Sequence, residues 1–145
     1  MKQETWQLLE ERYREYPESR AEPVPAEEVD QASQQLGISF PSDYREFVQR
    51  YGGGMVGHLP IYGLRRVQWM DRTMWSVIDL NRAFREDRWP GVDDWLIISV
   101  DQGGNPIGIA PDGSVWVSDH DFGIIDKLAD DFESFLRKVC LEIEP

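Results

Sequence analysis

Side chains able to do chemistry gather late in the chain, where Asp101 ends an apolar run and Asp119, His120 and Asp121 end another. Carboxylate oxygens and an imidazole nitrogen are ligands that Mg²⁺, Mn²⁺ or Zn²⁺ accept, and a metal held this way can activate water for hydrolysis. The spacing argues against such a site, because Asp119 and Asp121 share a face only if the segment is extended. Aspartate beside glycine is also ordinary turn chemistry. A metal-dependent hydrolase is therefore the least favoured hypothesis, and we expect no catalytic residue, cofactor or metal.

These residues follow segments that the sequence predicts as β-strands. Residues 95–100 are almost continuously apolar, so we expect this strand to be covered on both faces. Turns at residues 102–105 and 111–113 lead into two more strands. Asp-Gly between hydrophobic runs indicates a hairpin, because glycine takes the positive φ that the turn requires. In the third strand, Trp116 should lie on the face opposite its two valine neighbours.

Apolar residues three and four positions apart predict the helices. Thr5 is expected to cap the first helix, and Gly37 has the residue type that suits the end of the second. Residues 65–88 are the hardest to place: a strand over 65–72 and a helix from 74 or 75 to about 85, capped by Thr73, are expected. The other expected helices cover residues 5–16, 25–36, 41–51 and 127–141.

Helices first, then antiparallel strands, then a closing helix are typical of an α+β domain. We expect a central twisted antiparallel sheet, with the N-terminal helices and a C-terminal helix packed against it. The 145 residues suit a single domain over residues 1–145, in which residues 1–20 form a helix that extends the core domain. The lone cysteine, Cys140, falls in a helical pattern and is expected to be buried and inert.

Acidic residues dominate the charge, with 27 acidic against 15 basic residues and a net charge of −12. They are concentrated in residues 89–136, which hold ten acidic residues and one basic residue. This balance argues against nucleic acid as a direct partner, because phosphates need a basic surface. No apolar run approaches the roughly 18 residues that span a bilayer, and the polar N-terminus predicts no signal peptide, so we expect a cytoplasmic protein without membrane contact. These acidic side chains either form a solvated surface without a partner or create an electrostatic field that attracts a basic partner.

Two stretches carry a recognisable set of motifs. The first is Leu-Gly-Ile-Ser-Phe-Pro-Ser-Asp-Tyr-Arg-Glu-Phe at residues 36–47, followed by Tyr-Gly-Gly-Gly at 51–54. The second combines the strand ending in Asp101 with Asp-Gly-Ser-Val-Trp at 112–116, Asp-His-Asp at 119–121 and Phe-Glu-Ser-Phe-Leu at 132–136. In order and spacing these motifs resemble the SUKH superfamily of Smi/Knr-like proteins over residues 20–140. Ala110 departs from the pattern, since many members carry an acidic residue there.

The resemblance implies an α+β fold and a function in binding rather than catalysis. Many bacterial members look like immunity proteins, which bind and neutralise a toxin encoded beside them, often a nuclease. The implied partner is a cognate toxin with a basic surface, bound through acidic side chains. Trp69 or Trp75 is expected to act as an aromatic hot spot. The expected acidic anchors are Asp93, Asp94, Asp101, Asp112, Asp119 and Asp121.

A regulatory or scaffold module that binds another protein, a peptide or a small ligand is the alternative. Tryptophans beside Arg65, Arg66 and Arg72 would mark such a surface, or they simply complete the core of the sheet. The sequence leaves the oligomeric state open between a monomer and a weak homodimer.

Overall fold

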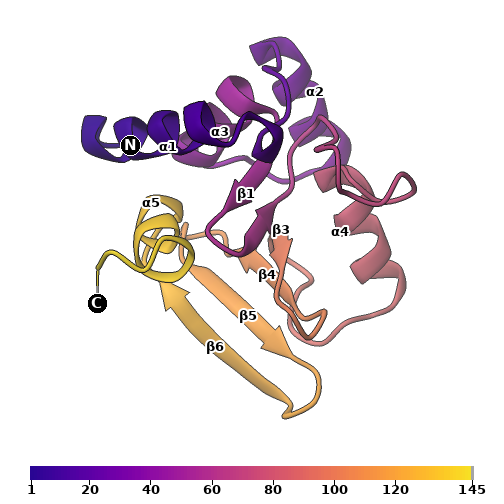
Figure 1. The fold of residues 1–145 in the computed structure, drawn as a ribbon. Helices are drawn as coiled ribbons and strands as arrows, with labels where there is room; N and C mark the ends of the chain where they lie inside the picture. Colours follow the sequence, from indigo (N-terminus) through magenta and orange to yellow (C-terminus); the bar gives the residue numbers. More distant parts are fainter. Residues whose placement is uncertain (145) are drawn as a thin grey trace.

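Four antiparallel strands form the sheet on which the domain is assembled (Figure 1). In this computed structural model, which describes residues 1–144, they follow one another in the order β3-β4-β5-β6. Two shorter strands form a separate hairpin beside β3, where the backbone N–H of Tyr62 donates to the carbonyl of Ile98 at 2.8 Å. The strands are β1 (Gly54–Val56), β2 (Leu59–Ile61), β3 (Leu96–Val100), β4 (Pro106–Ile109), β5 (Val115–Asp119) and β6 (Ile124–Ala129).

Helices lie at one end of this sheet and along one side of it (Figure 1). Helices α1 to α3 gather at the end, α5 lies between them and the sheet, and α4 packs against β3. This arrangement confirms the predicted α+β class. No helix in the described part of the chain is long and apolar enough to cross a membrane. The helices are α1 (Gln3–Glu15), a 3₁₀ turn (Pro17–Ser19), α2 (Ala26–Leu36), α3 (Ser42–Tyr51), α4 (Val77–Glu86) and α5 (Phe132–Phe135), which continues as a π-helical turn (Leu136–Cys140).

Two hydrophobic clusters hold the sheet, one on each face. The larger lies under α1, α3 and α5, where Tyr44 meets Phe132 edge to face with ring centroids 5.3 Å apart. The smaller lies under α4, where Leu80 packs with Ile97. Burial of each such side chain contributes about 1.5–3 kcal/mol. Successive residues of β3 enter the two clusters in turn, so the prediction that this strand is covered on both faces is confirmed. Cys140 is buried in the larger cluster, also as predicted.

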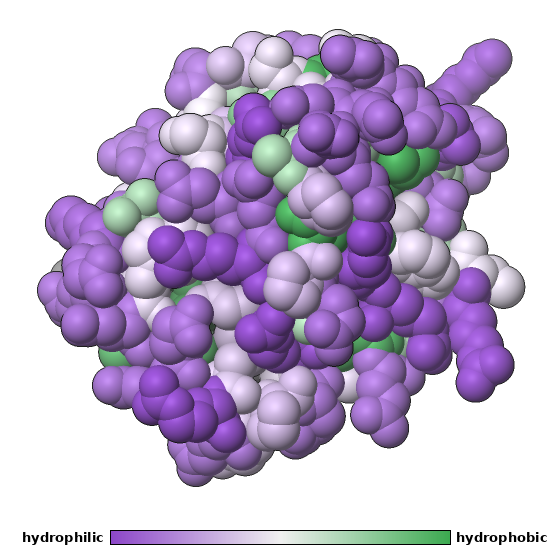
Figure 2. Space-filling view, turned by 90° about the horizontal axis from the view of Figure 1, so that it is seen from above, coloured by the Kyte–Doolittle hydropathy of each residue, from purple (hydrophilic) through white to green (hydrophobic). Residues whose placement is uncertain are grey.

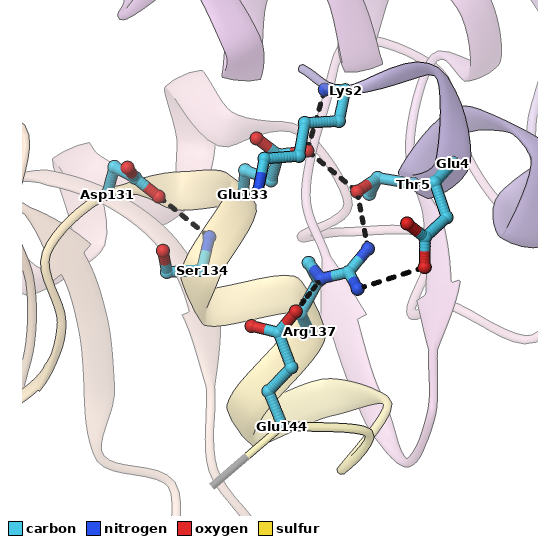
Figure 3. A network of polar contacts seen from close by, with 8 residues as sticks. All are labelled: Lys2, Glu4, Thr5, Asp131, Glu133, Ser134, Arg137 and Glu144. Carbon is cyan, nitrogen blue, oxygen red and sulfur yellow. Dashed lines mark hydrogen bonds and ion pairs between the residues drawn. The ribbon is translucent and has the colours of Figure 1, made fainter.

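Polar contacts tie the N-terminal helix to the last one (Figure 3). Thr5, expected to cap α1, lies inside the helix instead and is fully buried. Its hydroxyl donates to Glu133 Oε2 at 2.7 Å and accepts from Arg137 Nη1 at 2.9 Å. Arg137 also contacts Glu4 and Glu144, at 3.3 Å and 2.5 Å. The hydroxyl is therefore used to dock two helices rather than to begin one.

The expected strand over residues 65–72 is wrong, because this segment is a chain of turns. The guanidinium of Arg66 folds back within the segment and donates from Nε and Nη2 to the carbonyl of Met70, at 3.0 and 2.6 Å. The next helix, α4, begins at Val77 rather than at residue 74 or 75. Its cap is Ser76, whose Oγ accepts from the backbone N–H of Asp79 at 3.1 Å, while Thr73 bonds to Asp71.

The last helix also begins later than expected. Residues 127–129 belong to β6 and pair with β5, and α5 starts at Phe132. Asp131 caps it by accepting from the backbone N–H of Ser134 at 2.7 Å. An aspartate cap followed by two helical aromatic residues therefore overrides the apolar spacing that pointed to residue 127.

Candidate protein-binding surface

Asp101 folds the turn between β3 and β4. Its Oδ1 accepts from the backbone N–H groups of Gly103 and Asn105, both at 2.9 Å, and its Oδ2 accepts from Asn105 Nδ2 at 3.1 Å. This is the local hydrogen bonding by which aspartate stabilises a turn. Asp101, one of the predicted anchors, therefore serves largely to stabilise this turn.

Asp112 and Asp119 fold the next two turns in the same way. Asp112 Oδ1 accepts from the backbone N–H of Ser114 at 3.0 Å and from the Ser114 hydroxyl, and these hydrogen bonds hold the pKa of Asp112 below its usual value. Asp119 Oδ1 accepts from the backbone N–H groups of Asp121 and Phe122, at 3.0 and 3.3 Å. Asp112 is exposed and Asp119 is partly exposed, so both also present charge to solvent.

Asn105 joins two of these turns. Its side-chain Nδ2 donates to Asp101, and its Oδ1 accepts from the backbone N–H of His120 at 3.0 Å. It is buried, and it brings the β3–β4 turn beside the acidic tripeptide after β5. Sequence reasoning treated Asn105 only as a turn residue, and no local pattern indicates that its side chain spans two hairpins. The described residues contain no group of three or more His, Cys, Asp or Glu side chains placed to hold a metal ion.

The charge of these carboxylates is not neutralised within the domain. None of the six predicted aspartate anchors takes part in an ion pair among the described residues. Lys127, the one basic residue of segment 89–136, pairs with Asp130 at 2.7 Å. Asp93 and Asp94 are exposed in the loop before β3, and Asp121 is exposed in the turn after β5. This half of the domain therefore presents uncompensated negative charge.

Large apolar side chains stand in the same region, at the end of the β5–β6 hairpin. Phe122 is 76% exposed, Ile124 46% and Ile125 45%. The two isoleucines lie on opposite faces of β6, since neighbouring residues of a strand alternate. Sequence reasoning missed this set because it began the last helix at residue 127 and singled out no exposed apolar side chain before it, although the run Phe-Gly-Ile-Ile after an acidic turn is visible in the sequence. We term the set Phe122, Ile124, Ile125, Asp119, Asp121 and Asp126 the hairpin tip.

A family model for the SMI1/KNR4 family (SUKH-1) matches residues 23–138, which run from just before α2 into the π-helical turn after α5. The chain belongs to this family. The resemblance inferred from the sequence is thus confirmed, and it supports protein binding as the general role of this SUKH-1 domain. Among curated proteins, no sequence match is found.

The helical end of the SUKH-1 domain offers less to a partner. Figure 2 views this end from above, and most of its surface is hydrophilic, with hydrophobic side chains in small separate areas. The guanidinium of Arg50 lies over the indole of Trp6, with its Cζ 3.8 Å from the ring centroid, and so covers that ring. The helical face therefore looks like a solvated surface, in contrast with the hairpin tip.

The two tryptophans expected as hot spots have different environments. Trp75 is partly buried and packs on Ala21, Val67 and Met70, so it helps to complete a small core cluster. Trp69 is 47% exposed in the turns of residues 65–72. Of the two, Trp69 is the more exposed to solvent.

Proposed function

We propose that this SUKH-1 domain is a bacterial immunity protein that acts in the cytoplasm and neutralises a basic cognate toxin by binding it through the hairpin tip. The observation that carries the proposal is the coincidence of exposed apolar side chains with uncompensated acid. Phe122, Ile124 and Ile125 stand exposed among Asp119, Asp121 and Asp126.

Each part of this surface has a distinct role in association. Large apolar side chains left exposed together at one end of a hairpin favour an interaction site, and burying a phenylalanine such as Phe122 yields about 1.5–3 kcal/mol. The carboxylates raise the rate of encounter with a basic protein and disfavour acidic ones. A nuclease cleft that normally holds phosphates is a fitting complement, because a projecting acidic hairpin can occupy it.

A second observation favours the alternative of a scaffold or regulatory module. A hollow of about 660 Å³ opens between the α2–α3 connection and the β4–β5 turn, with Asp93 and Asp94 among its lining residues. Its volume lies in the range of small-molecule sites. If the hollow binds a small ligand, adding that ligand should raise the melting temperature of the domain. If the domain binds only a toxin, small ligands should leave the melting temperature unchanged and only the toxin should raise it.

The test is co-expression of the full chain with the product of the adjacent gene. We expect rescue of growth and a complex on gel filtration whose affinity falls as salt rises. The double variant Phe122→Ser with Asp121→Lys should abolish both. Tyr16→Ser with Glu15→Lys is the matched control, because Tyr16 is 47% exposed and follows the exposed Glu15 at the end of α1, and it should bind like the wild type. Absence of rescue and of a complex with the wild type would refute the proposal.

A further inference from the structure

A second hollow, of about 430 Å³, opens beside the hairpin tip on the face of the sheet that carries α4. We term it the tryptophan groove. Trp95, only 5% exposed, is one of the aromatic residues that line it, and Ile125 of the hairpin tip closes one side. Ile125 packs closely over Gly91, where a Cβ atom would lie 2.3 Å from Ile125 Cδ1. The groove is lined by Gly91, Trp95, Pro111, Asp112, Trp116 and Ile125, among others.

A chain of hydrogen bonds fixes the orientation of the two side chains that matter most. The indole Nε1 of Trp116 donates to Ser114 Oγ at 2.7 Å, and the Ser114 hydroxyl donates to Asp112 Oδ1. The same contact lowers the pKa of Asp112, so its carboxylate stays charged at neutral pH. A flat indole and a negative carboxylate are thereby held together at one opening before any partner arrives.

We propose that the tryptophan groove receives an arginine side chain of the basic partner; this inference rests on the proposed function and adds the contact that selects the partner. A guanidinium stacks on an indole and pairs with a carboxylate, which is the combination that Trp116 and Asp112 present. An aliphatic stem would contact Pro111 and Ile125. Arginine suits the groove better than lysine because a planar cation can use the indole face and the carboxylate together.

The charges around the groove favour a cation. Asp93 and Asp94 line the adjoining hollow, which shares Ala110 and Pro111 with the groove. Two basic residues near these hollows, Lys127 and Arg85, reduce this preference. Lys127 faces Trp116 across the β5–β6 pair and is held by Asp130 at 2.7 Å.

The second basic residue, Arg85, lies in the adjoining hollow, where its Nη1 is 3.4 Å from the carbonyl of Leu36. A second copy of this chain is a poor occupant of the groove, because two molecules of charge −12 repel one another.

The direct test titrates the full chain with acetyl-Gly-Arg-Gly-amide while the tryptophan indole N–H signals are followed by NMR. The signal of Trp116, identified with Trp116→Phe, and the amide signal of Ile125 should shift saturably. The indole signal of Trp69 should stay in place. Acetyl-Gly-Glu-Gly-amide is the matched probe and should shift none of them. Equal shifts with both peptides, or no shift at Trp116, would overturn the inference.

Two variants sharpen the test. Asp112→Asn should weaken binding of the arginine peptide about fivefold, because one exposed ion pair is lost. Lys127→Gln should strengthen it about twofold by removing a competing cation. A purely structural role for these residues predicts no opposite changes, so a change in the same direction for both variants would contradict the inference.

Failure of this inference differs from failure of the proposed function. If the toxin binds the wild type and Asp112→Asn equally well while the hairpin-tip double variant loses it, the groove has no role and the proposed function stands. If no toxin binds but the arginine peptide still shifts Trp116, the proposed function falls and the groove stands. Dimers in sedimentation that Ile125→Lys abolishes would identify a second copy as the occupant and overturn the arginine assignment.

Discussion

Arg137 and Thr5 are 132 positions apart in the chain, yet Nη1 of the arginine donates to Oγ1 of the threonine at 2.9 Å (Figure 3). The family match begins at residue 23, so Thr5 lies in a helix outside the matched range while Arg137 lies near its end. Trp6 and Leu9 of the same helix are buried in the main core. We infer that α1 folds as part of one unit with the SUKH-1 core.

Thr5→Val tests this relationship. Valine keeps the shape of the side chain but removes the hydroxyl, which leaves Glu133 and Arg137 each short of one hydrogen bond. The free energy of unfolding should fall by about 1–3 kcal/mol, as measured by urea denaturation. Thr73→Val is the matched control, since that residue is exposed and its hydroxyl donates to Asp71 within the same turn, and its effect should stay within about 0.5 kcal/mol. Equal effects of the two variants would contradict the docking role.

Gly37 and Gly52 form a second matched pair, because both end a helix with positive φ, at +70° and +73°. A Cβ at Gly37 meets no atom within 4 Å, whereas a Cβ at Gly52 would lie 2.0 Å from the carbonyl oxygen of Glu22. Gly37→Ala should therefore cost only the backbone strain, about 1–2 kcal/mol. Gly52→Ala should cost at least about 3 kcal/mol, a large part of the stability of a typical domain. Thermal and urea unfolding of both variants measure the difference, and similar losses would show that the loop at Glu22 yields freely.

Local signals predicted much of this fold correctly. Gly37 and the Asp-Gly turn after β4 take the positive φ expected of them, and the apolar run of β3 is buried on both faces. These features depend on neighbours in the sequence. The turns of residues 65–72 could not be predicted, because Arg66 stabilises them by contacts that no periodicity encodes.

The candidate site was predicted only in part. The acidic turns were found from residue type, but their hydrogen bonds show that Asp101, Asp112 and Asp119 also fold the hairpins. The exposure of Phe122 and Ile125 depends on the β5–β6 hairpin, and β6 runs on to Ala129 although the sequence placed the start of the last helix at residue 127. Long-range contacts, such as that of Asn105 with His120, are also invisible to local patterns, because the two residues lie far apart in the sequence.

The acid side of the stability profile should depend on Ser114. Its hydrogen bonds lower the pKa of Asp112 in the folded state, so this contact stabilises the fold above the ordinary carboxyl pKa and is lost as the pH falls through the lowered one. In Ser114→Ala the pKa of Asp112 should rise toward its usual value, and stability should fall less steeply below about pH 4. NMR titration of the Asp112 side-chain carboxyl carbon measures the first effect and urea unfolding at several pH values the second. An unchanged pKa would show that the backbone N–H of Ser114 alone causes the shift.

Asn105 provides the last prediction, because it positions the hairpin tip without belonging to it. Its amide bonds Asp101 on one side and the backbone N–H of His120 on the other, at 3.1 and 3.0 Å. Asn105→Ala removes the side-chain bond to Asp101 Oδ2 and leaves the backbone N–H of His120 without this acceptor, so stability should fall by about 1–3 kcal/mol. Hydrogen exchange at the His120 amide should quicken, and toxin affinity should fall although no contact residue has changed.

Gln102→Ala is the matched control, since Gln102 is an exposed residue of the same turn, and it should leave both properties unchanged. Unaltered exchange at His120 in Asn105→Ala would show that the pairing of β5 with β6 orders the tip by itself. Faster exchange with unaltered toxin affinity would instead separate the order of the tip from recognition, and would place the contact elsewhere on the acidic half of the domain.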